Sequence, residues 1–275
     1  MNIKCIALDL DRTTLNNAGK LSDETRRVLQ KVIAQGIHVV VASGRSFGSL
    51  PKDILQFPGI EYAITSNGAA IYHMPTGACI HNNCLTVQSV REILSLAKEA
   101  GAVLETFIRG QAYADAAYVA EPEPYQNSQG AINYIKRTRK PIEDIHTFIL
   151  EHETELDCID LVVRSMEERD RLAELARSNI SDVYLTSAAP QLLEIAHRDA
   201  GKHQGLCFIM EHLGIERESI AAFGDGDNDA DMLEFVGCGI AVANSTPACL
   251  AAADHVSKSN EEDGVAYGIE TILGL

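Results

Sequence analysis

Positive charge is scarce in this sequence. It has 23 lysines and arginines against 39 aspartates and glutamates, which gives a formal net charge of -16. Nucleic acids and anionic membrane surfaces bind proteins through basic faces. The charge balance therefore argues against both classes of partner, although it says little about the fold.

Long apolar runs and paired cysteine motifs are also missing. The first apolar stretch runs only from Ile3 to Leu8, too short for the hydrophobic region of a signal peptide. No run approaches the roughly 20 residues of a membrane span. The seven cysteines form neither a C-x-x-C pair nor a zinc-finger spacing, which predicts reduced thiols. These absences predict a cytoplasmic protein that is not a membrane protein.

Aromatic residues are few, and tryptophan is absent, but 46% of the residues are hydrophobic. That fraction is ample for a packed core. A length of 275 residues allows two domains, at roughly 150 residues each.

Both ends of the chain alternate between strand-like and helix-like segments. Ser22 can cap a helix that ends at Gly36, and a further helix is expected to follow Gly44 and stop near Pro51. Strands are predicted at 3–8, 37–42, 61–65, 219–223 and 238–242, and helices at 202–213 and 230–236. The rhythm predicts an α/β fold, with residues 1–81 and 197–275 forming a doubly wound, Rossmann-like parallel-sheet core.

The middle of the chain has a different texture. A helix is predicted from Thr86 to Gly101, and another over 167–177. Strands are predicted at 103–108, 113–115, 157–163, 183–186 and 192–196. Neighbouring strands and paired helices indicate an α+β module inserted in the core domain, over residues 82–196.

Two aspartates separated by one residue, Asp9 and Asp11, follow the first strand directly. In an open α/β sheet, ligands bind outside the carboxyl ends of the strands. Two carboxylates this close repel each other unless a cation or a shared proton relieves them. Turn residues are common after a strand, but a magnesium ion would satisfy this pair and could carry phosphate oxygens with it.

The stretch Gly224–Asp231 is the strongest single signal, because five acids or amides crowd a strand-to-helix turn. Two weaker signals also fall at predicted strand ends or helix starts. Ser43-Gly44-Arg45 offers a hydroxyl and backbone N–H groups that suit an anion, although a plain helix cap would look the same. Lys202 opens a helix, where its point charge suits a phosphate.

These motifs, in this order, resemble the haloacid dehalogenase (HAD) superfamily of phosphotransferases, specifically the Cof-like phosphatases with a type IIB cap. The motifs are Asp9-Leu10-Asp11-Arg12-Thr13, Ser43-Gly44-Arg45, Lys202 and Gly224-Asp225-Gly226-Asp227-Asn228-Asp229. The stretches Thr65–Ala69 and Ser259–Ala266 are similar to that branch as well. The resemblance extends over the whole chain.

The resemblance implies a set of catalytic roles. Asp9 would be the nucleophile that forms an aspartyl-phosphate, and Asp11 would protonate the leaving oxygen and then activate water. Mg²⁺ would be held by the side chains of Asp9 and Asp225 and by the backbone carbonyl of Asp11. Asp229 would act through a water molecule or through its neighbours.

The resemblance also implies a phosphate-binding set, which comprises Ser43, Lys202, Asn228 and backbone N–H groups near Leu10 and Gly44. The inserted module would be the cap. Arg45, His197 and Arg198 are candidate substrate contacts, and weaker candidates in the cap are Arg109, Tyr125, Tyr134, Arg137 and Arg139.

One departure concerns Arg12, which stands where this branch usually has glycine. It removes no proposed catalytic group, and it could touch substrate or point to solvent. The predicted function is a Mg²⁺-dependent phosphatase of small phosphorylated metabolites, with sugar phosphates as the leading class. The alternatives are a phosphomutase or other phosphotransferase, a non-catalytic metabolite-binding protein, and a metal-dependent glycosyltransferase that uses D-x-D.

Overall fold

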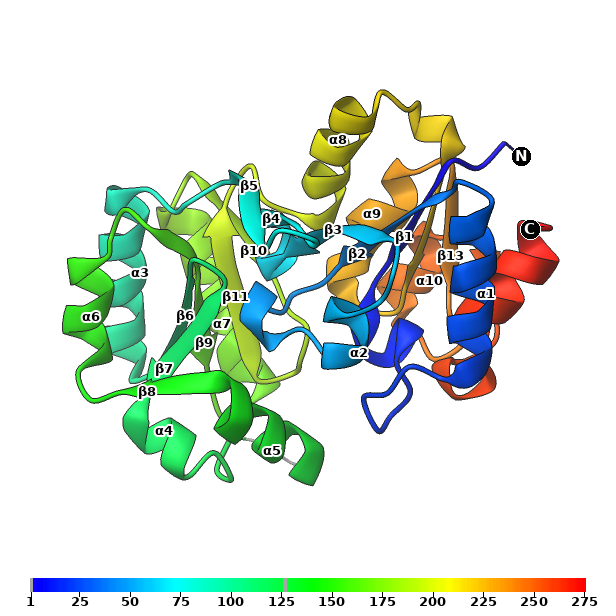
Figure 1. Cartoon of the computed structure of the whole chain (residues 1–275). Coiled ribbons are helices and arrows are strands. Elements are labelled where there is room, and N and C mark those ends of the chain that lie inside the picture. The colour runs from blue at the N-terminus through cyan, green and yellow to red at the C-terminus, as the bar shows by residue number, and fades with distance from the viewer. Residues whose placement is uncertain (1, 126–127) are drawn as a thin grey trace. The chain divides into compact units, whose positions relative to one another are not determined.

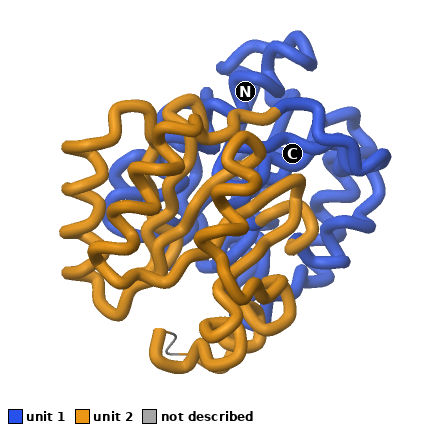
Figure 2. Tube along the Cα trace, turned by 90° about the vertical axis from the view of Figure 1, so that its left-hand side faces the viewer, with its two compact units in different colours: residues 1–45, 50–81, 201–275 blue, residues 46–49, 82–200 orange. Residues whose placement is uncertain are grey.

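The computed structural model describes residues 2–125 and 128–275, and the chain divides into two compact units (Figure 2). Unit 1 comprises Met1–Arg45, Leu50–His81 and Gly201–Leu275. Unit 2 comprises Ser46–Ser49 and Asn82–Ala200. The short segment 46–49 groups with unit 2 because its Gly48 N–H donates to the Gly110 carbonyl at 2.7 Å.

Unit 1 is built on an eight-stranded sheet with the order β14-β13-β12-β1-β2-β3-β4-β5. Its strands are β1 (Cys5–Leu8), β2 (His38–Ala42), β3 (Ile60–Thr65), β4 (Ala70–His73), β5 (Ala78–Asn82), β12 (Ile220–Gly224), β13 (Cys238–Ala241) and β14 (His255–Val256). Strand β1 pairs in parallel with both β12 and β2, whereas β4 runs antiparallel to β3. The continuous apolar runs of β1 and β2 are buried because helices cover both faces of a parallel sheet.

The helices of unit 1 lie on both faces of this sheet (Figure 1). They are α1 (Asp23–Ala34), α2 (Lys52–Leu55), α8 (Lys202–Leu213), α9 (Ala230–Phe235), α10 (Pro247–Ala252) and α11 (Gly264–Tyr267). Helices α1 and α11 pack together on one face, while α8, α9 and α10 share a buried apolar core with the strands on the other. The Ser22 hydroxyl caps α1 by accepting from Thr25 N–H at 3.0 Å. The predicted doubly wound core is confirmed.

The helix predicted to follow Gly44 and stop near Pro51 was wrong. Residues 43–46 form an irregular turn, Phe47–Ser49 is a single short turn, and α2 begins after Pro51 rather than ending there. Proline disfavours helical dihedrals in the residue before it, but its own fixed φ suits a helix start. Ser43 therefore follows β2 without capping a helix.

Unit 2 contains a six-stranded sheet with the order β10-β11-β9-β6-β7-β8. Its strands are β6 (Val103–Ile108), β7 (Gln111–Asp115), β8 (Arg139–Ile142), β9 (Leu156–Val162), β10 (Val183–Thr186) and β11 (Leu192–His197). All neighbouring pairs run antiparallel except β7 and β8, which are parallel. This arrangement is the α+β module that the sequence predicts.

Helices also flank the sheet of unit 2. They are α3 (Val87–Ala100), α4 (Ala116–Ala120), α5 (Gln129–Thr138), α6 (Ile145–Glu151) and α7 (Met166–Asn179). Helices α3, α6 and α7 share one large apolar core with β6, β9 and β11. No sequence pattern predicted α4, α5, α6 or β8. Strand β8 has no alternating apolar pattern, and its Pro141 is tolerated because the strand lies at the sheet edge.

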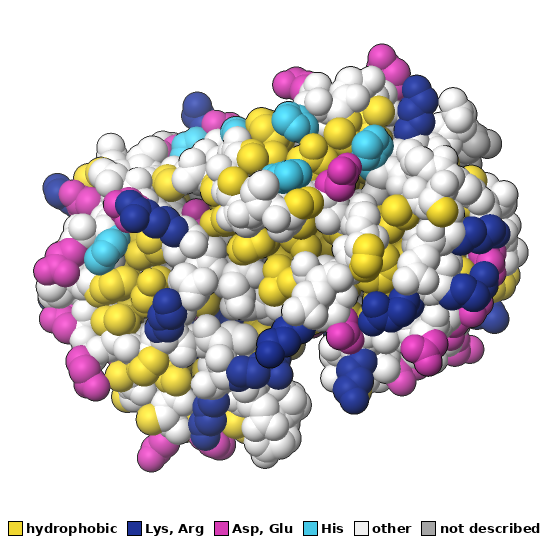
Figure 3. Space-filling model, in the orientation of Figure 1, with side chains coloured by type: hydrophobic (Ala, Val, Ile, Leu, Met, Phe, Trp, Pro, Cys, Tyr) yellow, Lys and Arg dark blue, Asp and Glu magenta, His cyan; other side chains and the backbone are white. Residues whose placement is uncertain are grey.

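Histidine side chains gather near α8 on the face of the molecule drawn in Figure 3. The ring of Phe208 on α8 stacks with His81 at a centroid separation of 4.5 Å and with His212 at 5.8 Å. Tyr62 on β3 contacts His212 and also His73 on β4. These ring contacts fasten the β3–β5 side of the sheet to α8. No helix in the described part of the chain is long and apolar enough to span a membrane.

Candidate active site

The loop after β1 carries the first two aspartates of the predicted site. Asp9 is 5% exposed and is held in place by a hydrogen bond from its N–H to the Phe223 carbonyl on β12, at 3.0 Å. The next residue, Leu10, is fully buried. The chain then reverses at Arg12, whose φ of 62° and ψ of 5° lie in the left-handed region. The carboxyl end of the central strand thus places Asp9 inside the protein and Asp11 near its surface.

Lys202, at the first position of α8, bridges two of the predicted carboxylates. Its Nζ donates to Asp9 Oδ1 and to Asp229 Oδ1, both at 2.6 Å. The lysine side chain is fully buried. Burial lowers the pKa of Lys202, but the carboxylates of Asp229 and Asp9 outweigh burial and hold it above its usual value. The ammonium is therefore charged, and it holds the two aspartates in one place.

The acid-rich loop after β12 brings two more carboxylates to the same place. Asp225 Oδ1 accepts from the Thr13 hydroxyl at 2.9 Å. Asp229 Oδ2 accepts from the backbone N–H groups of Asp225 and Gly226, at 3.0 and 2.9 Å. Asp229 thus pairs with Lys202 through one oxygen and shapes the loop through the other.

Burial and the repulsion between carboxylates raise the pKa values of Asp9 and Asp225. Burial is the largest cause for Asp9, whose pKa is well above its usual value, and the charge of Asp229 adds to it. Burial followed by the charge of Asp229 raises the pKa of Asp225 to about 6. The cluster contains three carboxylates and only one cation that is buried with them, Lys202. The remaining negative charge is unpaired, and unpaired buried charge is unfavourable.

The donor set fits a divalent metal ion. Asp9, Asp225 and Asp229 each offer a carboxylate oxygen, and these oxygens all lie within 4.8 Å of one another. Hard oxygen ligands of this kind suit Mg²⁺. A metal here would also relieve the repulsion that raises the pKa of Asp9 and Asp225. The side chain of Asp11 is not one of these three.

Asp11 is paired with Arg45, another residue that the sequence analysis named. Arg45 Nε donates to Asp11 Oδ2 at 2.7 Å and Nη2 donates to Asp11 Oδ1 at 2.6 Å. The Arg45 side chain is 12% exposed and that of Asp11 is 52% exposed. This bidentate geometry fixes the orientation of the Asp11 carboxylate. Ser43 lies beside them, and its hydroxyl accepts from the Arg45 N–H at 3.2 Å.

Asn228, predicted to bind phosphate, is held by a residue that the role assignment left out. Its Nδ2 donates to Asn67 Oδ1 at 3.0 Å. The carbonyl of Asn67 in turn accepts from the Gly201 N–H at 2.7 Å, just before Lys202. A Cβ atom on Gly68 would lie 2.1 Å from the Gly201 carbonyl oxygen, so only glycine fits there. The loop at 66–68 thereby ties the start of α8 to the acidic loop.

Arg12 reaches back over the same cluster. Its Nε lies 3.7 Å from Asp225 Oδ2, and its Nη2 donates to the Asn244 carbonyl at 3.3 Å. The Asn244 side chain holds the Arg12 backbone by donating to its carbonyl at 2.8 Å.

His197 and Arg198 belong to unit 2, whereas the carboxylate cluster belongs to unit 1. His197 is close to Asp199, at 3.6 Å, and the Arg198 side chain is 65% exposed. Arg139, a weaker candidate, is buried against Glu105, to which its Nη2 donates at 2.7 Å. The structure therefore does not bring these three residues together with the carboxylates inside one unit.

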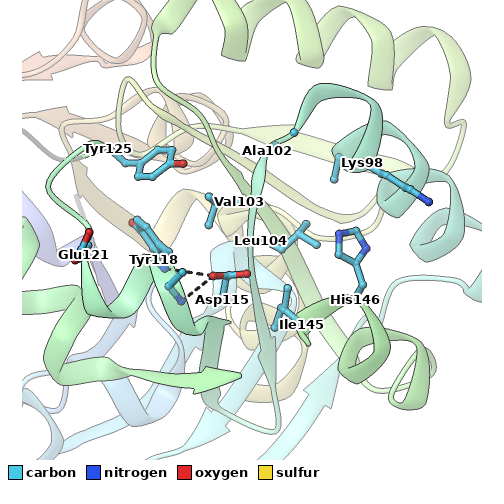
Figure 4. A pocket seen from close by; sticks show the side chains of 13 residues that line it. Lys98, Ala102, Val103, Leu104, Asp115, Tyr118, Glu121, Tyr125, Ile145 and His146 are labelled. Carbon is cyan, nitrogen blue, oxygen red and sulfur yellow. Dashed lines mark hydrogen bonds between the residues drawn. The ribbon is translucent and has the colours of Figure 1, made fainter. Parts of the chain in front are cut away.

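Unit 2 also contains a cavity of about 440 Å³ (Figure 4). It lies between the end of α3, the start of β6, helix α4 and the start of α6, and its lining includes Tyr118, Tyr125 and His146. Tyr125 is one of the weaker candidate contacts. None of the residues predicted to take part in the chemical step lines this cavity.

Three contributors to the site were not assigned a role from the sequence: Thr13, Asn67 and Asn244. Thr13 and Asn67 lie inside motifs that the resemblance already rests on, so a signal for them was present. Asn244 is 232 residues from Arg12, and only the fold shows that they meet.

Comparison with known proteins agrees with this geometry. A family model for haloacid dehalogenase-like hydrolases matches residues 6–269. A curated Bacillus subtilis relative, 5-amino-6-(5-phospho-D-ribitylamino)uracil phosphatase YitU, is 29% identical, and the match covers 98% of this chain and 97% of that protein.

Two solved structures share the fold. A haloacid dehalogenase-like hydrolase from B. subtilis superposes with a TM-score of 0.84 at 27% identity, covering 98% of this chain and all of that one. The HAD subclass IIB sugar phosphatase BT4131 superposes with a TM-score of 0.79 at 18% identity, covering 98% and 99%. The predicted fold, a parallel-sheet core with an inserted α+β module, is thus confirmed. The family model extends over nearly the whole chain, and the protein belongs to the haloacid dehalogenase-like hydrolase family.

Proposed function

We propose that the protein is a Mg²⁺-dependent phosphatase that hydrolyses small phosphorylated metabolites through an aspartyl-phosphate on Asp9. The observation that supports this most directly is the buried cluster in which Lys202 bridges Asp9 and Asp229 beside Asp225. Family membership and the phosphatase named among the relatives agree with it. That relative acts on a phosphate ester of a ribityl group, which supports sugar or sugar-alcohol phosphates as substrates here.

In the first step, the Asp9 carboxylate attacks phosphorus, an oxygen–phosphorus bond forms, and the ester oxygen leaves with its bonding electrons. Asp11 gives that oxygen a proton. In the second step, Asp11 takes a proton from water, whose oxygen attacks the phosphorus of the aspartyl-phosphate. Inorganic phosphate leaves, and Asp9 is regenerated.

The other residues would orient the phosphoryl group and neutralise its negative charge. Lys202, Ser43, Asn228 and the N–H groups near Leu10 and Gly44 would hold the phosphoryl oxygens, as positioning dominates phosphoryl transfer. Arg45 would pair through its two hydrogen bonds with the ionised Asp11 that takes a proton from water in the second step. Mg²⁺ bound by Asp9, Asp225 and the Asp11 carbonyl would neutralise negative charge on the transferring group. Unit 2 would serve as the cap domain, and Arg198 and His197 remain proposed substrate contacts.

We also place the protein in the cytoplasm, on the basis of its thiols. Four cysteines are buried free thiols: Cys5, Cys158, Cys238 and Cys249. Free thiols of this kind are typical of a reducing compartment.

The test is phosphate release from a panel of sugar phosphates, sugar-alcohol phosphates and nucleotides, with Mg²⁺ and with EDTA. We expect metal-dependent release from a subset, and no release by Asp9→Asn, whose fold is checked by circular dichroism. Wild-type-like hydrolysis by Asp9→Asn would refute the nucleophile assignment. Transfer of the phosphoryl group to an added acceptor alcohol, without release of inorganic phosphate, would point instead to a phosphotransferase.

A further inference from the structure

Three cationic side chains contact the carboxylates of this site among the described residues, and they use their N–H donors differently. Lys202 is fully buried, and its Nζ forms ion pairs with Asp9 and Asp229, each at 2.6 Å. Arg45 is 12% exposed and is bound by both arms to Asp11. Both cations are therefore committed to carboxylates by short, charge-assisted bonds.

Arg12 is the exception. Its side chain is 62% exposed, its Nε is 3.7 Å from Asp225 Oδ2, and its hydrogen bond to the Asn244 carbonyl is 3.3 Å long. A guanidinium carries five N–H donors in a planar fork that matches phosphate and carboxylate groups. These two long contacts leave most of that fork open to a ligand.

The base of Arg12 is nevertheless fixed. Asn244 Nδ2 donates to the Arg12 carbonyl at 2.8 Å, and the residue has a φ of 62°. A left-handed conformation is unfavourable for any residue with a Cβ. The chain therefore presents an anchored arginine, and not a freely moving one, beside Asp225 at the exposed margin of the cluster.

The charges of the site make this cation significant. Three carboxylates, Lys202 and one divalent metal ion together carry no net charge, and the Asp11–Arg45 pair is neutral. Arg12 then adds one positive charge at the margin, in a protein whose net charge is -16. A fixed cation in such surroundings favours anionic over neutral groups nearby.

We propose that Arg12 binds a second anionic group of the substrate, so that the preferred substrate is a phosphate ester bearing a further phosphate or carboxylate. This inference rests on the proposed phosphatase function and names the substrate class of the same site. Lys202 would hold the phosphoryl group that is transferred, and a bound metal ion would neutralise its charge. Arg12 acts on the part of the molecule that leaves.

The experiment compares kcat/KM for two matched substrate pairs at saturating Mg²⁺. One pair is fructose 6-phosphate and fructose 1,6-bisphosphate, and the other is glycerol 3-phosphate and 3-phosphoglycerate. We expect the wild type to prefer a substrate with the extra anion by at least about tenfold. The two pairs show whether that anion is a phosphate or a carboxylate.

Variants of Arg12 measure the contribution of its guanidinium to this preference. Arg12→Gln should reduce the preference to below about threefold, and Arg12→Lys, which keeps the charge but loses the fork, should retain part of it. Arg217→Gln is the matched control, because Arg217 is an exposed arginine just before the other end of β12. The Mg²⁺-induced shift in melting temperature of each variant shows that metal binding is intact.

The outcomes separate the two proposals. Hydrolysis with the same preference in the wild type and Arg12→Gln would overturn the role of Arg12 and leave the phosphatase assignment standing. Failure of the wild type to hydrolyse these substrates and the wider panel would refute the phosphatase assignment, and this inference with it. A preference that falls in Arg12→Gln and stays in Arg217→Gln supports it.

Discussion

Each of the two units contains a cluster of three buried carboxylates with one cation, but the two clusters are built in different ways. In unit 1, Asp9, Asp225 and Asp229 come from loops that follow β1 and β12, and Lys202 comes from the start of α8. In unit 2, the acids lie within strands. Glu105 and Glu194, on β6 and β11, are both in register with Asp160 on the strand between them, and Arg139 binds Glu105.

The origin of the acids decides what each cluster can do. Loops at the carboxyl ends of parallel strands turn toward one point, so that the oxygens of unit 1 converge within 4.8 Å. In unit 2 the three acids lie side by side on three adjacent strands, one acid on each strand. Among the described residues, the unit 1 group is the one that could hold a metal. Burial and the charges of Glu194 and Glu105 instead raise the pKa of Asp160 well above its usual value.

The largest expected effects come from removing each cation. Lys202→Met leaves Asp9 and Asp229 buried without their partner, and Arg139→Met does the same to Glu105. Each should lower the free energy of unfolding by about 3–5 kcal/mol, measured by urea titration. Turnover per folded molecule should fall more than 100-fold for Lys202→Met and less than about tenfold for Arg139→Met. Equal losses of turnover would break the distinction between the two clusters.

The next effect is on pH dependence. A folded-state pKa raised above the unfolded value means that Asp160 stabilises the protein at low pH and loses this contribution as pH rises through the folded value. Burial raises the pKa of Asp157, also on β9, to about 7, so its contribution is lost between roughly pH 4 and 7. Asp157→Asn and Asp160→Asn should each flatten the fall in unfolding free energy with pH, by up to about 1.4 kcal/mol per pH unit.

Urea titrations from pH 4 to 8 measure this slope, and Asp144→Asn is the control. Asp144 is exposed, and its pKa is lowered by hydrogen bonds to Thr147, so its substitution should not flatten the slope. Slopes in Asp157→Asn and Asp160→Asn that match the wild type would mean that these carboxyls are ionised without penalty.

A smaller effect is expected from metal binding, which should depend on the cluster of unit 1 and not on that of unit 2. A metal that binds the folded state at 100 times its dissociation constant adds about 2.7 kcal/mol of stability. Mg²⁺ should therefore raise the melting temperature of the wild type and of Glu194→Gln, but not that of Asp225→Asn. Scanning calorimetry with Mg²⁺ and with EDTA measures the shift. A full shift in Asp225→Asn would remove that residue from the metal site.

The smallest expected effect concerns two arginines with left-handed dihedrals, one in each unit. Arg12 has a φ of 62° and Arg109 a φ of 50°. Glycine relieves this strain but gains more freedom in the unfolded chain, so Arg12→Gly should raise the unfolding free energy by about 1 kcal/mol at most. Arg109→Gly should gain less, because it loses a salt bridge to Glu155 at 2.9 Å. A loss larger than about 1 kcal/mol in Arg12→Gly would show that its contacts outweigh the strain.

Most of the secondary structure of unit 1 could be predicted from the sequence, and the structure shows why. Buried parallel strands are continuous apolar runs, and β1 and β2 end directly at Asp9 and Ser43. Ser22 and Gly214 mark a helix start and a helix end by their capping chemistry. Local signals of this kind can be recognised from the sequence alone.

The remainder depends on contacts between distant residues. No local pattern shows that Arg45 binds Asp11, that Asn67 orients Asn228, or that Asn244 holds Arg12. The same holds for β8, a short strand with charged residues and a proline that is ordered by pairing with β7. The roles assigned to these residues remain predictions until the variants are measured.

The two chain connections that bound the insertion meet each other. Asn83 Nδ2 donates to the Asp199 carbonyl at 2.9 Å, although 116 residues separate them. A segment whose ends meet can change in length with little effect on the rest of the chain, because the closure entropy varies only slowly with loop length. We therefore expect that residues 84–198 can change in length, or be exchanged, with little effect on the fold of unit 1. Exchange of this module would leave the acids and the lysine of the unit 1 cluster in place.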